Sequence, residues 1–476
     1  MTVLLYVLGI LIVLLGLAVS IALHEIGHLV PAKLFGVKVT QYMIGFGRTI
    51  WSRKKGETEY GVKMLPLGGY VSMIGMYPPS KPGEAPREAS TGFLNSVVEE
   101  APVGTKRHSS DVADGSAVEQ PAEPRRGIAG LIDDAREASA ETIEHGEDNR
   151  TFFRLPAWKK IIIMLGGPFM NLVLAFVFFA IVICGFGVAQ NSTTLAYLSE
   201  CLVPATSNAT TCSADDPEAP AAAAGLLPGD TLLAVDGTQI ESWDQFRTIV
   251  SESPDVTLSV TIERDGAEQK VNLTPQANQR YLFDDAGQVL EDSDGTPLTE
   301  TVGMIGATPA TEVVQQPITE VPAFVGENVK NVAGVIIRLP ERLVDVWNAA
   351  FGAEERDPNG PMSVVGVGRL AGEVASMDQA PIASRVQFMF SLVGSLNVAL
   401  FVFNLVPLMP LDGGHVAGAI YEWLKRGFAK LRKKPDPGPV DTAKMVPITF
   451  VVVIALGAMS LLLMYADIVK PVNLFG

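Results

Sequence analysis

Four apolar segments, each long enough to cross a bilayer, constrain this chain of 476 residues more than any other feature. A membrane helix needs roughly 20 largely apolar residues, and all of its backbone N–H and C=O groups are hydrogen-bonded within the segment. The mean hydropathy of +0.27 agrees with such a chain. The sequence therefore predicts a multi-pass α-helical membrane protein with four transmembrane helices. The candidate spans are residues 3–23, 161–183, 388–406 and 446–464.

The first span resembles a secretory signal only in being apolar and N-terminal. It has no basic residues before it, and it is longer than the apolar part of a typical signal. We therefore expect a retained helix.

The charge distribution predicts the topology. Basic residues follow the first span, precede the second and lie between the third and fourth, whereas residues 187–385 hold 29 Asp or Glu against 10 Lys or Arg. Cytoplasmic loops carry the excess of Lys and Arg, so 187–385 and both termini are expected outside a cell inner (plasma) membrane. No basic cluster suggests a nucleic-acid partner.

A metal-ligand motif, His24-Glu25-Ile26-Gly27-His28, follows the first apolar run. Histidines at i and i+4 project from nearly the same side of a helix, so both imidazoles can bind one ion while the Glu meets a metal-bound water. The motif predicts half of a Zn²⁺ site near the cytoplasmic end of the helix. Two unrelated histidines beside an apolar segment are the alternative.

The third ligand is expected at the end of the third span, where Asn404 leads through two prolines to Asp412-Gly413-Gly414. A carboxylate at the end of a membrane helix is costly, and binding a metal offsets that cost. The predicted topology puts Asp412 at the depth of His24 and His28, with one Zn²⁺ per chain and an open position for water. His415 is left unassigned, as a solvated residue or a neighbour of the ligands.

Between the first two spans the chain changes character twice. Residues 40–73 read as strands with glycines, either an ordinary cytoplasmic hairpin or an element that dips into the membrane beside the metal. Residues 78–150 are rich in Pro, Glu, Ala, Ser and Gly, and they predict a solvated insertion in which His108 and His145 are surface residues. In the second span, Asn171 needs a polar partner.

The outer segment contains a compact β domain over residues 199–276. The loop Ala-Ala-Ala-Ala-Gly-Leu-Leu-Pro-Gly-Asp at 221–230 leads into a strand, an Asp-Gly turn and a helix. This order resembles a PDZ domain, which binds an extended peptide or a chain end by strand addition; a β domain without a ligand is the alternative. Cys201 and Cys212 lie close together in an oxidising compartment, and a disulfide between them is left open. A helical pattern follows at 322–350.

The chain as a whole resembles the site-2 protease family of intramembrane metalloproteases, in its bacterial branch that regulates sigma-factor activation. The resemblance rests on H-E-x-x-H with N-x-x-P-x-x-x-L-D-G-G, supported by matches that cover nearly the whole chain except 78–150. It departs from the family at Arg48, where many members have proline, and in having one PDZ domain, as in actinobacterial forms. The supporting matches are Gly45-Phe46-Gly47, Gly167-Pro168 with Asn171, the PDZ loop and Gly360-Pro361.

The resemblance implies a zinc metalloendopeptidase that performs regulated intramembrane proteolysis. It favours a membrane-re-entrant β element at 40–73, Glu25 as catalytic base, and Asn404 as a contact for substrate backbone. The implied partners are the lipid bilayer, a single-pass anti-sigma factor already trimmed by a site-1 protease, and a peptide or substrate terminus on the PDZ domain. The rivals are a zincin-like protease with a soluble active site and a catalytically silent membrane PDZ scaffold.

The expected domain organisation follows from these features. Its parts are 1–32, the first helix with the histidine motif; 33–77, the cytoplasmic or re-entrant β region; 78–150, the disordered insertion; 151–186, the second helix; 187–198, a linker; 199–276, the PDZ domain; 277–385, a region with an amphipathic helix; 386–416, the third helix with the Asp motif; 417–444, a basic cytoplasmic loop; and 445–470, the fourth helix.

Overall fold

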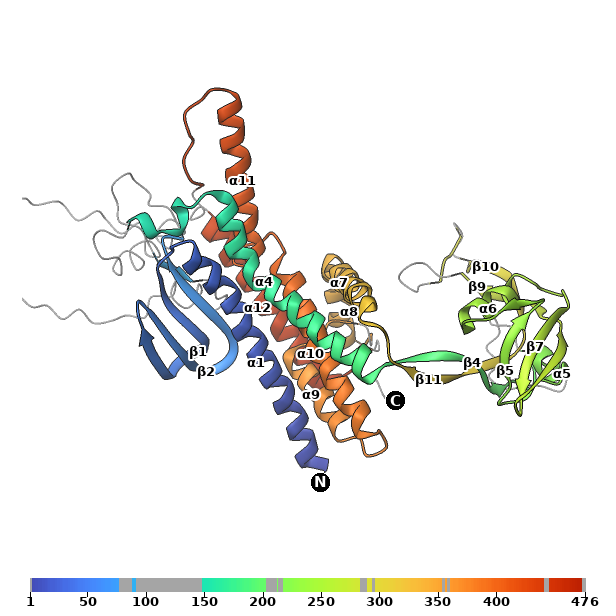
Figure 1. The fold of residues 1–476 in the computed structure, drawn as a ribbon. Coiled ribbons are helices and arrows are strands. Elements are labelled where there is room, and N and C mark those ends of the chain that lie inside the picture. The colour runs from blue at the N-terminus through green and yellow to red at the C-terminus, as the bar shows by residue number, and fades with distance from the viewer. Residues whose placement is uncertain are drawn as a thin grey trace, which may run out of the picture. The chain divides into compact units, whose positions relative to one another are not determined.

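The computed structural model divides the chain into two compact units, Met1–Phe186 with Pro317–Gly476, and Gly187–Gln316 (Figure 1). Most of the expected insertion at 78–150, including His108 and His145, lies outside the described residues. The structure describes residues 2–76, 88–90, 148–202, 212, 217–282, 289–292, 296–352, 356–357, 360–440 and 445–472.

Among the residues that the structure describes, the first unit contains four helices that are long and apolar enough to span a membrane, as expected. Their apolar side chains are largely exposed on the surface of the unit, which suits contact with lipid. The second of these helices continues into a π-helix, η3 (Ile181–Phe186). The four are α1 (Thr2–Leu34), α4 (Ala157–Ala180), α10 (Ile382–Asn404) and α12 (Val446–Val469).

The spans pack through small and polar residues. A Cβ atom on Gly27 would lie 2.1 Å from the carbonyl oxygen of Gly166, so the backbones of α1 and α4 touch. Between α1 and α10, the buried Asn397 amide donates to Ser20 Oγ at 2.9 Å. Both contacts are typical of membrane helices, where close backbone approach and interhelical hydrogen bonds replace hydrophobic burial.

A β-hairpin covers one side of α1. Its first strand bends at Gly45 and Gly47, which have φ angles of 91° and 85°, so Tyr42 lies opposite both Val71 and Tyr60. The hairpin is thereby folded into a compact sheet that packs on α1 and α4. The strands are β1 (Val39–Lys55), β2 (Thr58–Ile74) and the short β3 (Glu88–Ser90), which pairs with the end of β2.

Two segments differ from the expected organisation. The helical pattern at 322–350 is two helices, because Pro340 has no N–H to continue the first and instead begins the second. The third span ends at Asn404, and Asp412 begins a separate helix that extends into the expected basic loop at 417–444. The helices concerned are α7 (Val321–Ile337), α8 (Leu339–Phe351) and α11 (Asp412–Leu431).

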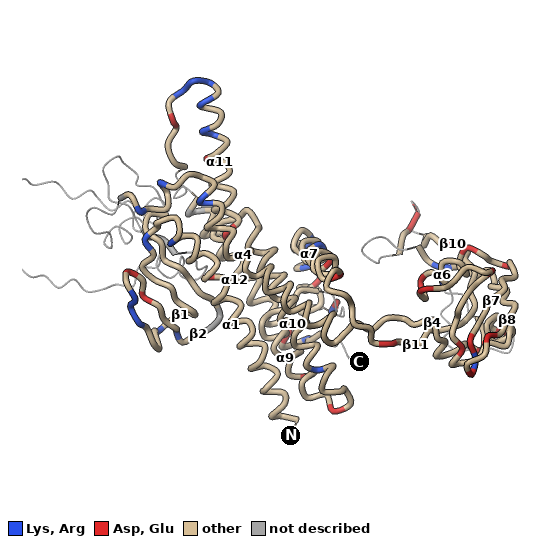
Figure 2. The backbone as a smooth tube through the Cα atoms, viewed as in Figure 1, with Lys and Arg blue, Asp and Glu red and all other residues tan. Residues whose placement is uncertain are grey.

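The described part of the first unit also contains helix α9 and three short 3-10 turns. Helix α9 packs against α1, where a Cβ atom on Gly9 would lie 2.5 Å from the Ala371 carbonyl oxygen. Figure 2 shows Lys and Arg gathered at the hairpin and at the end of α11. The elements are α9 (Val364–Ala375), η1 (Asp148–Arg150), η2 (Phe152–Arg154) and η4 (Ile318–Glu320).

The second unit is a β domain with its own core. Its main sheet has the order β11-β4-β5-β7-β8, so it includes strands outside the expected 199–276, and α6 packs beside it. Asp236 and Gly237 both have positive φ, as a tight hairpin turn requires. The elements are β4 (Val188–Leu198), α5 (Pro220–Ala223), β5 (Thr231–Val235), β6 (Thr238–Gln239), α6 (Trp243–Ser251), β7 (Leu258–Arg264), β8 (Ala267–Leu273), β9 (Gln276–Tyr281), β10 (Thr299–Met304) and β11 (Ala307–Val314).

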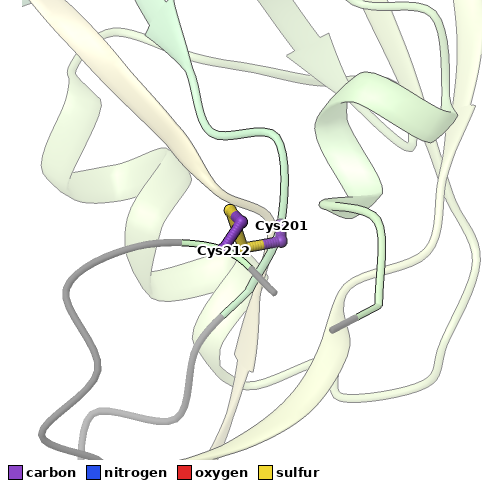
Figure 3. Close-up of a disulfide and its surroundings, with 2 residues drawn as sticks. All are labelled: Cys201 and Cys212. Carbon is purple, nitrogen blue, oxygen red and sulfur yellow. A yellow bond between two sulfur atoms is a disulfide. The ribbon is translucent and has the colours of Figure 1, made fainter. Parts of the chain in front are cut away.

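A disulfide and an ion pair with a buried carboxylate stabilise this unit. Cys201 and Cys212 form a disulfide (Figure 3), the pairing that the sequence left open. The buried Asp230 carboxylate accepts two hydrogen bonds from the Arg264 guanidinium, both at 2.7 Å, and one from the Leu227 amide at 2.8 Å. The Arg264 hydrogen bonds hold the pKa of Asp230 below its ordinary value.

We expect Asp230→Asn to destabilise the second unit by about 2 kcal/mol, because Arg264 loses its charged partner. Since the folded pKa of Asp230 is lowered, its contribution to stability is present at neutral pH and is lost as the pH falls below about 4. Amide hydrogen exchange in β5 and β7 of the full chain, corrected for intrinsic rates, measures both effects. Asp244→Asn, at an exposed i,i+3 pair with Arg247, is the control; equal protection in the two variants would contradict the expectation.

Candidate metal centre

The two histidines of the motif lie on the side of α1 that contacts α4. Both are buried, and His28 is fully so. The Nδ1 atom of His28 lies 2.8 Å from the Ile163 carbonyl oxygen, which can only accept a hydrogen bond. Nδ1 of His28 therefore carries the proton, and its Nε2 is left with a lone pair for a metal.

Asn171 on α4 holds the second histidine. Its side-chain amide lies 3.0 Å from His24 Nδ1, while the amide oxygen Oδ1 is buried with no hydrogen-bond partner among the described residues. Exchanging the two amide atoms, which have nearly the same shape, lets Oδ1 accept from His24 Nδ1–H. This arrangement gives Asn171 the polar partner that the sequence required, and it also leaves His24 Nε2 free to bind a metal.

Asp412 approaches both histidines. Its Oδ2 atom lies 3.3 Å from each Nε2, and the two Nε2 atoms are 3.2 Å apart. Zinc ligands at about 2.0–2.1 Å in a tetrahedron stand about 3.3 Å from one another. The three atoms therefore form one face of a tetrahedron of the size that Zn²⁺ requires, and the fourth vertex is left for water or substrate.

The backbone before Asp412 makes this approach possible. The chain leaves α10 at Asn404 and turns back within a few residues, so closely that a Cβ atom on Gly413 would lie 2.4 Å from the Leu405 carbonyl oxygen. Only glycine fits there. Asp412 then begins α11, where the positive end of the helix dipole favours a carboxylate.

Gly167 on α4 lies directly against both imidazoles. A Cβ atom at this position would lie 2.2 Å from His28 Nε2 and 2.7 Å from His24 Nε2. Glycine and proline in a membrane helix permit a close approach of a neighbour. The sequence does not show that this neighbour is the pair of imidazole nitrogens.

Glu25 faces the hairpin and is buried. A Cβ atom on Gly69 of β2 would lie 2.9 Å from Glu25 Cγ, so this strand passes directly over the carboxylic side chain. The carboxylate is therefore placed on the part of α1 between the histidines and the sheet. A side chain in that position can exchange a proton with a water or an amine bound at the metal.

The remaining candidates lie at the edge of the site. Asn404 is half-buried at the end of α10, which lies near the candidate metal ligands. Among the described residues, its side chain makes no hydrogen bond to them. His415 lies one turn after Asp412 and lines a small pocket of about 20 Å³ together with Lys160 and Glu422. That volume is enough for a water molecule.

We expect Gly167→Ala to reduce bound zinc to less than a tenth of one ion per chain, because the new methyl group would overlap the space of both ligand nitrogens. Gly457→Ala in α12 is the control, since a Cβ atom there meets nothing within 4 Å. Atomic absorption of the purified, folded chain measures the metal content. Full zinc content in Gly167→Ala would show that the imidazoles do not converge at this point.

The chain is similar in sequence to known metalloproteases. The zinc metalloprotease Rip1 of Mycobacterium bovis (strain BCG / Pasteur 1173P2) is 29% identical over 478 residues, covering 99% of each chain. The metalloprotease MmpA of Caulobacter vibrioides is 27% identical and covers 85% of this chain and 84% of its own. The regulator of sigma-W protease RasP of Bacillus subtilis is 26% identical and covers 83% and 85%.

The family profile of peptidase family M50 matches residues 12–435. This range includes both histidines, the glutamate between them and Asp412, and it extends over most of the chain. The chain therefore belongs to peptidase family M50, the site-2 proteases.

Proposed function

We propose that this protein is an intramembrane zinc metalloprotease in which His24, His28 and Asp412 hold Zn²⁺ and Glu25 is the catalytic base. The observation that carries the proposal is the triangle of three buried ligand atoms at 3.2–3.3 Å, at the end of a membrane-spanning helix. When bound, Zn²⁺ supplies a Lewis acid that lowers the pKa of a coordinated water to about 7 and polarises a carbonyl group.

The protein's own residues perform the proton transfers. Glu25 takes a proton from the attacking water and then gives it to the nitrogen of the leaving amine, so that one carboxylate serves as base and as acid. His28 stays oriented through the Ile163 carbonyl, and His24 through Asn171. Burial of Glu25 keeps other water away from the reacting groups.

The substrate we propose is a single-pass membrane protein. A helix keeps its peptide carbonyls hydrogen-bonded, so the scissile segment must be extended before attack. Strand addition to the hairpin beside Gly69 would extend it next to Glu25, since Gly69 already lies on that side chain. Gly61 and Val62 cannot take part, because each of them pairs with two segments of β1. Asn404, at the end of α10, would bind the substrate backbone on the other side of the metal.

The unit at 187–316 supports a proposal about substrate choice. We propose that it is a PDZ domain, on the basis of its loop at 221–230 and of α6. We propose further that it lies outside the cell inner membrane and that the metal site lies near the cytoplasmic side. Acidic residues are spread over this unit and basic ones over the hairpin and α11 (Figure 2), in agreement with that topology. Such a domain would bind a peptide or a freshly cut substrate end, or exclude substrates with intact outer domains.

An anti-sigma factor is the substrate class we propose, because one of the relatives is named a regulator of sigma-W protease. A catalytically silent scaffold is the rival function. The complete triad and the buried Glu25 support the protease instead, since a scaffold has no need to bury a glutamate beside three converging ligand atoms.

We expect Glu25→Gln to lower cleavage of a reconstituted single-pass reporter by at least 10³-fold while the chain keeps one zinc, because the amide cannot accept the proton. Glu373→Gln, at a half-buried glutamate near the end of α9 that pairs with Arg369, is the matched control. Asp412→Ala is expected to lose both the zinc and the cleavage. Cleavage by Glu25→Gln at the rate of the unmodified chain would refute the mechanism.

A further inference from the structure

The side of α1 that faces the sheet carries Glu25 together with Ala22 and Leu29. These positions are three and four residues apart, so they share one face of the helix, while His24 and His28 point toward α4. The hairpin covers this face with β1 and β2. In the proposed protease, the distance between a strand-bound substrate and Glu25 therefore depends on how the sheet packs on α1.

Tyr42 makes a polar contact between the sheet and the backbone of α1. Its hydroxyl donates a hydrogen bond of 2.9 Å to the carbonyl oxygen of Ala22, one turn before Glu25. The ring is buried, 7% exposed, and lies 5.7 Å from the ring of Tyr60. The hydroxyl thus crosses from the sheet to the helix backbone beside the catalytic base.

The register of the sheet links this contact to the active site. Tyr42 is opposite Val71, and Ile44, two residues further along β1, is opposite Gly69. Gly69 is the residue that lies on Glu25 Cγ. A bond that fixes Tyr42 against α1 therefore also fixes the distance between β2 and the carboxylate.

The Tyr42 hydroxyl can donate this hydrogen bond throughout the neutral pH range. Burial, with the neighbouring Glu25 carboxylate, raises the pKa of Tyr42 to about 12, so its hydroxyl remains protonated over the neutral range and always donates. Tyr60 offers a contrast on the same sheet, because its hydroxyl accepts from the exposed Lys33 ammonium at 2.7 Å and does not reach the α1 backbone.

We propose that Tyr42 is a positioning residue: its hydroxyl docks the β1–β2 hairpin on α1 so that a peptide strand added to the hairpin meets Glu25 and the metal at the reacting distance. The inference rests on the proposed protease function. A general base must lie within about 2.6–3.2 Å of the proton it takes, and a displacement of about 1 Å can cost a hundredfold in rate.

The test compares Tyr42→Phe with Tyr60→Phe in the full chain, reconstituted in lipid. Each variant loses one hydroxyl and keeps its ring, so packing is matched. We expect Tyr42→Phe to lower kcat/KM for a single-pass reporter about tenfold per bound zinc, and Tyr60→Phe to change it less than twofold. Equal values for the two variants overturn the proposal.

A second measurement separates positioning from general stability. Binding of a peptidyl hydroxamate, which occupies both the metal and the strand edge, is compared with that of acetohydroxamic acid, which reaches only the metal. We expect Tyr42→Phe to weaken the peptidyl compound about fivefold and the small one less than twofold, with zinc content unchanged. Parallel weakening of both, or loss of zinc, would assign Tyr42 a structural role only.

The two hypotheses fail in different ways. If the unmodified chain binds zinc and the peptidyl hydroxamate but cleaves no reporter, the proposed protease function is contradicted, and Tyr42 is judged on the two hydroxamates alone. If the unmodified chain cleaves and the hydroxamate pair does not separate the variants, only the role of Tyr42 is contradicted.

Discussion

A buried carboxylate facing two buried imidazole nitrogens is the constraint on which the first unit depends. Asp412 Oδ2 has no hydrogen-bond partner among the described residues, although both Nε2 atoms lie 3.3 Å away. An isolated charge in such a place is costly, and a divalent cation held by the three atoms would remove the cost. The surrounding glycines and prolines, and the hydrogen bonds from α4, keep these three atoms together.

Helix α4 supplies most of that support from one face. Four of its residues follow one another at helical spacing. Lys160 contacts Glu422 of α11, and Ile163 contacts His28. Gly167 contacts both imidazoles, and Asn171 contacts His24. One helix therefore relates the ligands of α1 to the helix that begins with Asp412.

The sequence was sufficient to predict the four spans, the strands at 40–73 and the meeting of His24, His28 and Asp412, because each leaves a periodic or chemical signal. It did not predict that Asp412 begins its own helix, since the Leu405–Leu411 turn depends on the close approach of Gly413 to the carbonyl groups of Leu405 and Val406. It placed one helix at 322–350 and overlooked the effect of Pro340. The contact of Gly167 with the imidazoles and that of Tyr42 with Ala22 arise only from tertiary packing, which single-chain patterns do not record.

The separation of the ligands along the chain has a consequence for biosynthesis. His24 and His28 enter the membrane first, the groups on α4 that orient them follow, and Asp412 is added only after the 187–316 unit has been made. In the proposed site, two imidazoles alone would hold zinc less tightly than all three ligands, so a nascent or truncated chain would lack the proposed centre. Proteolytic capacity is thus acquired late, once the domain proposed to select substrates is already present.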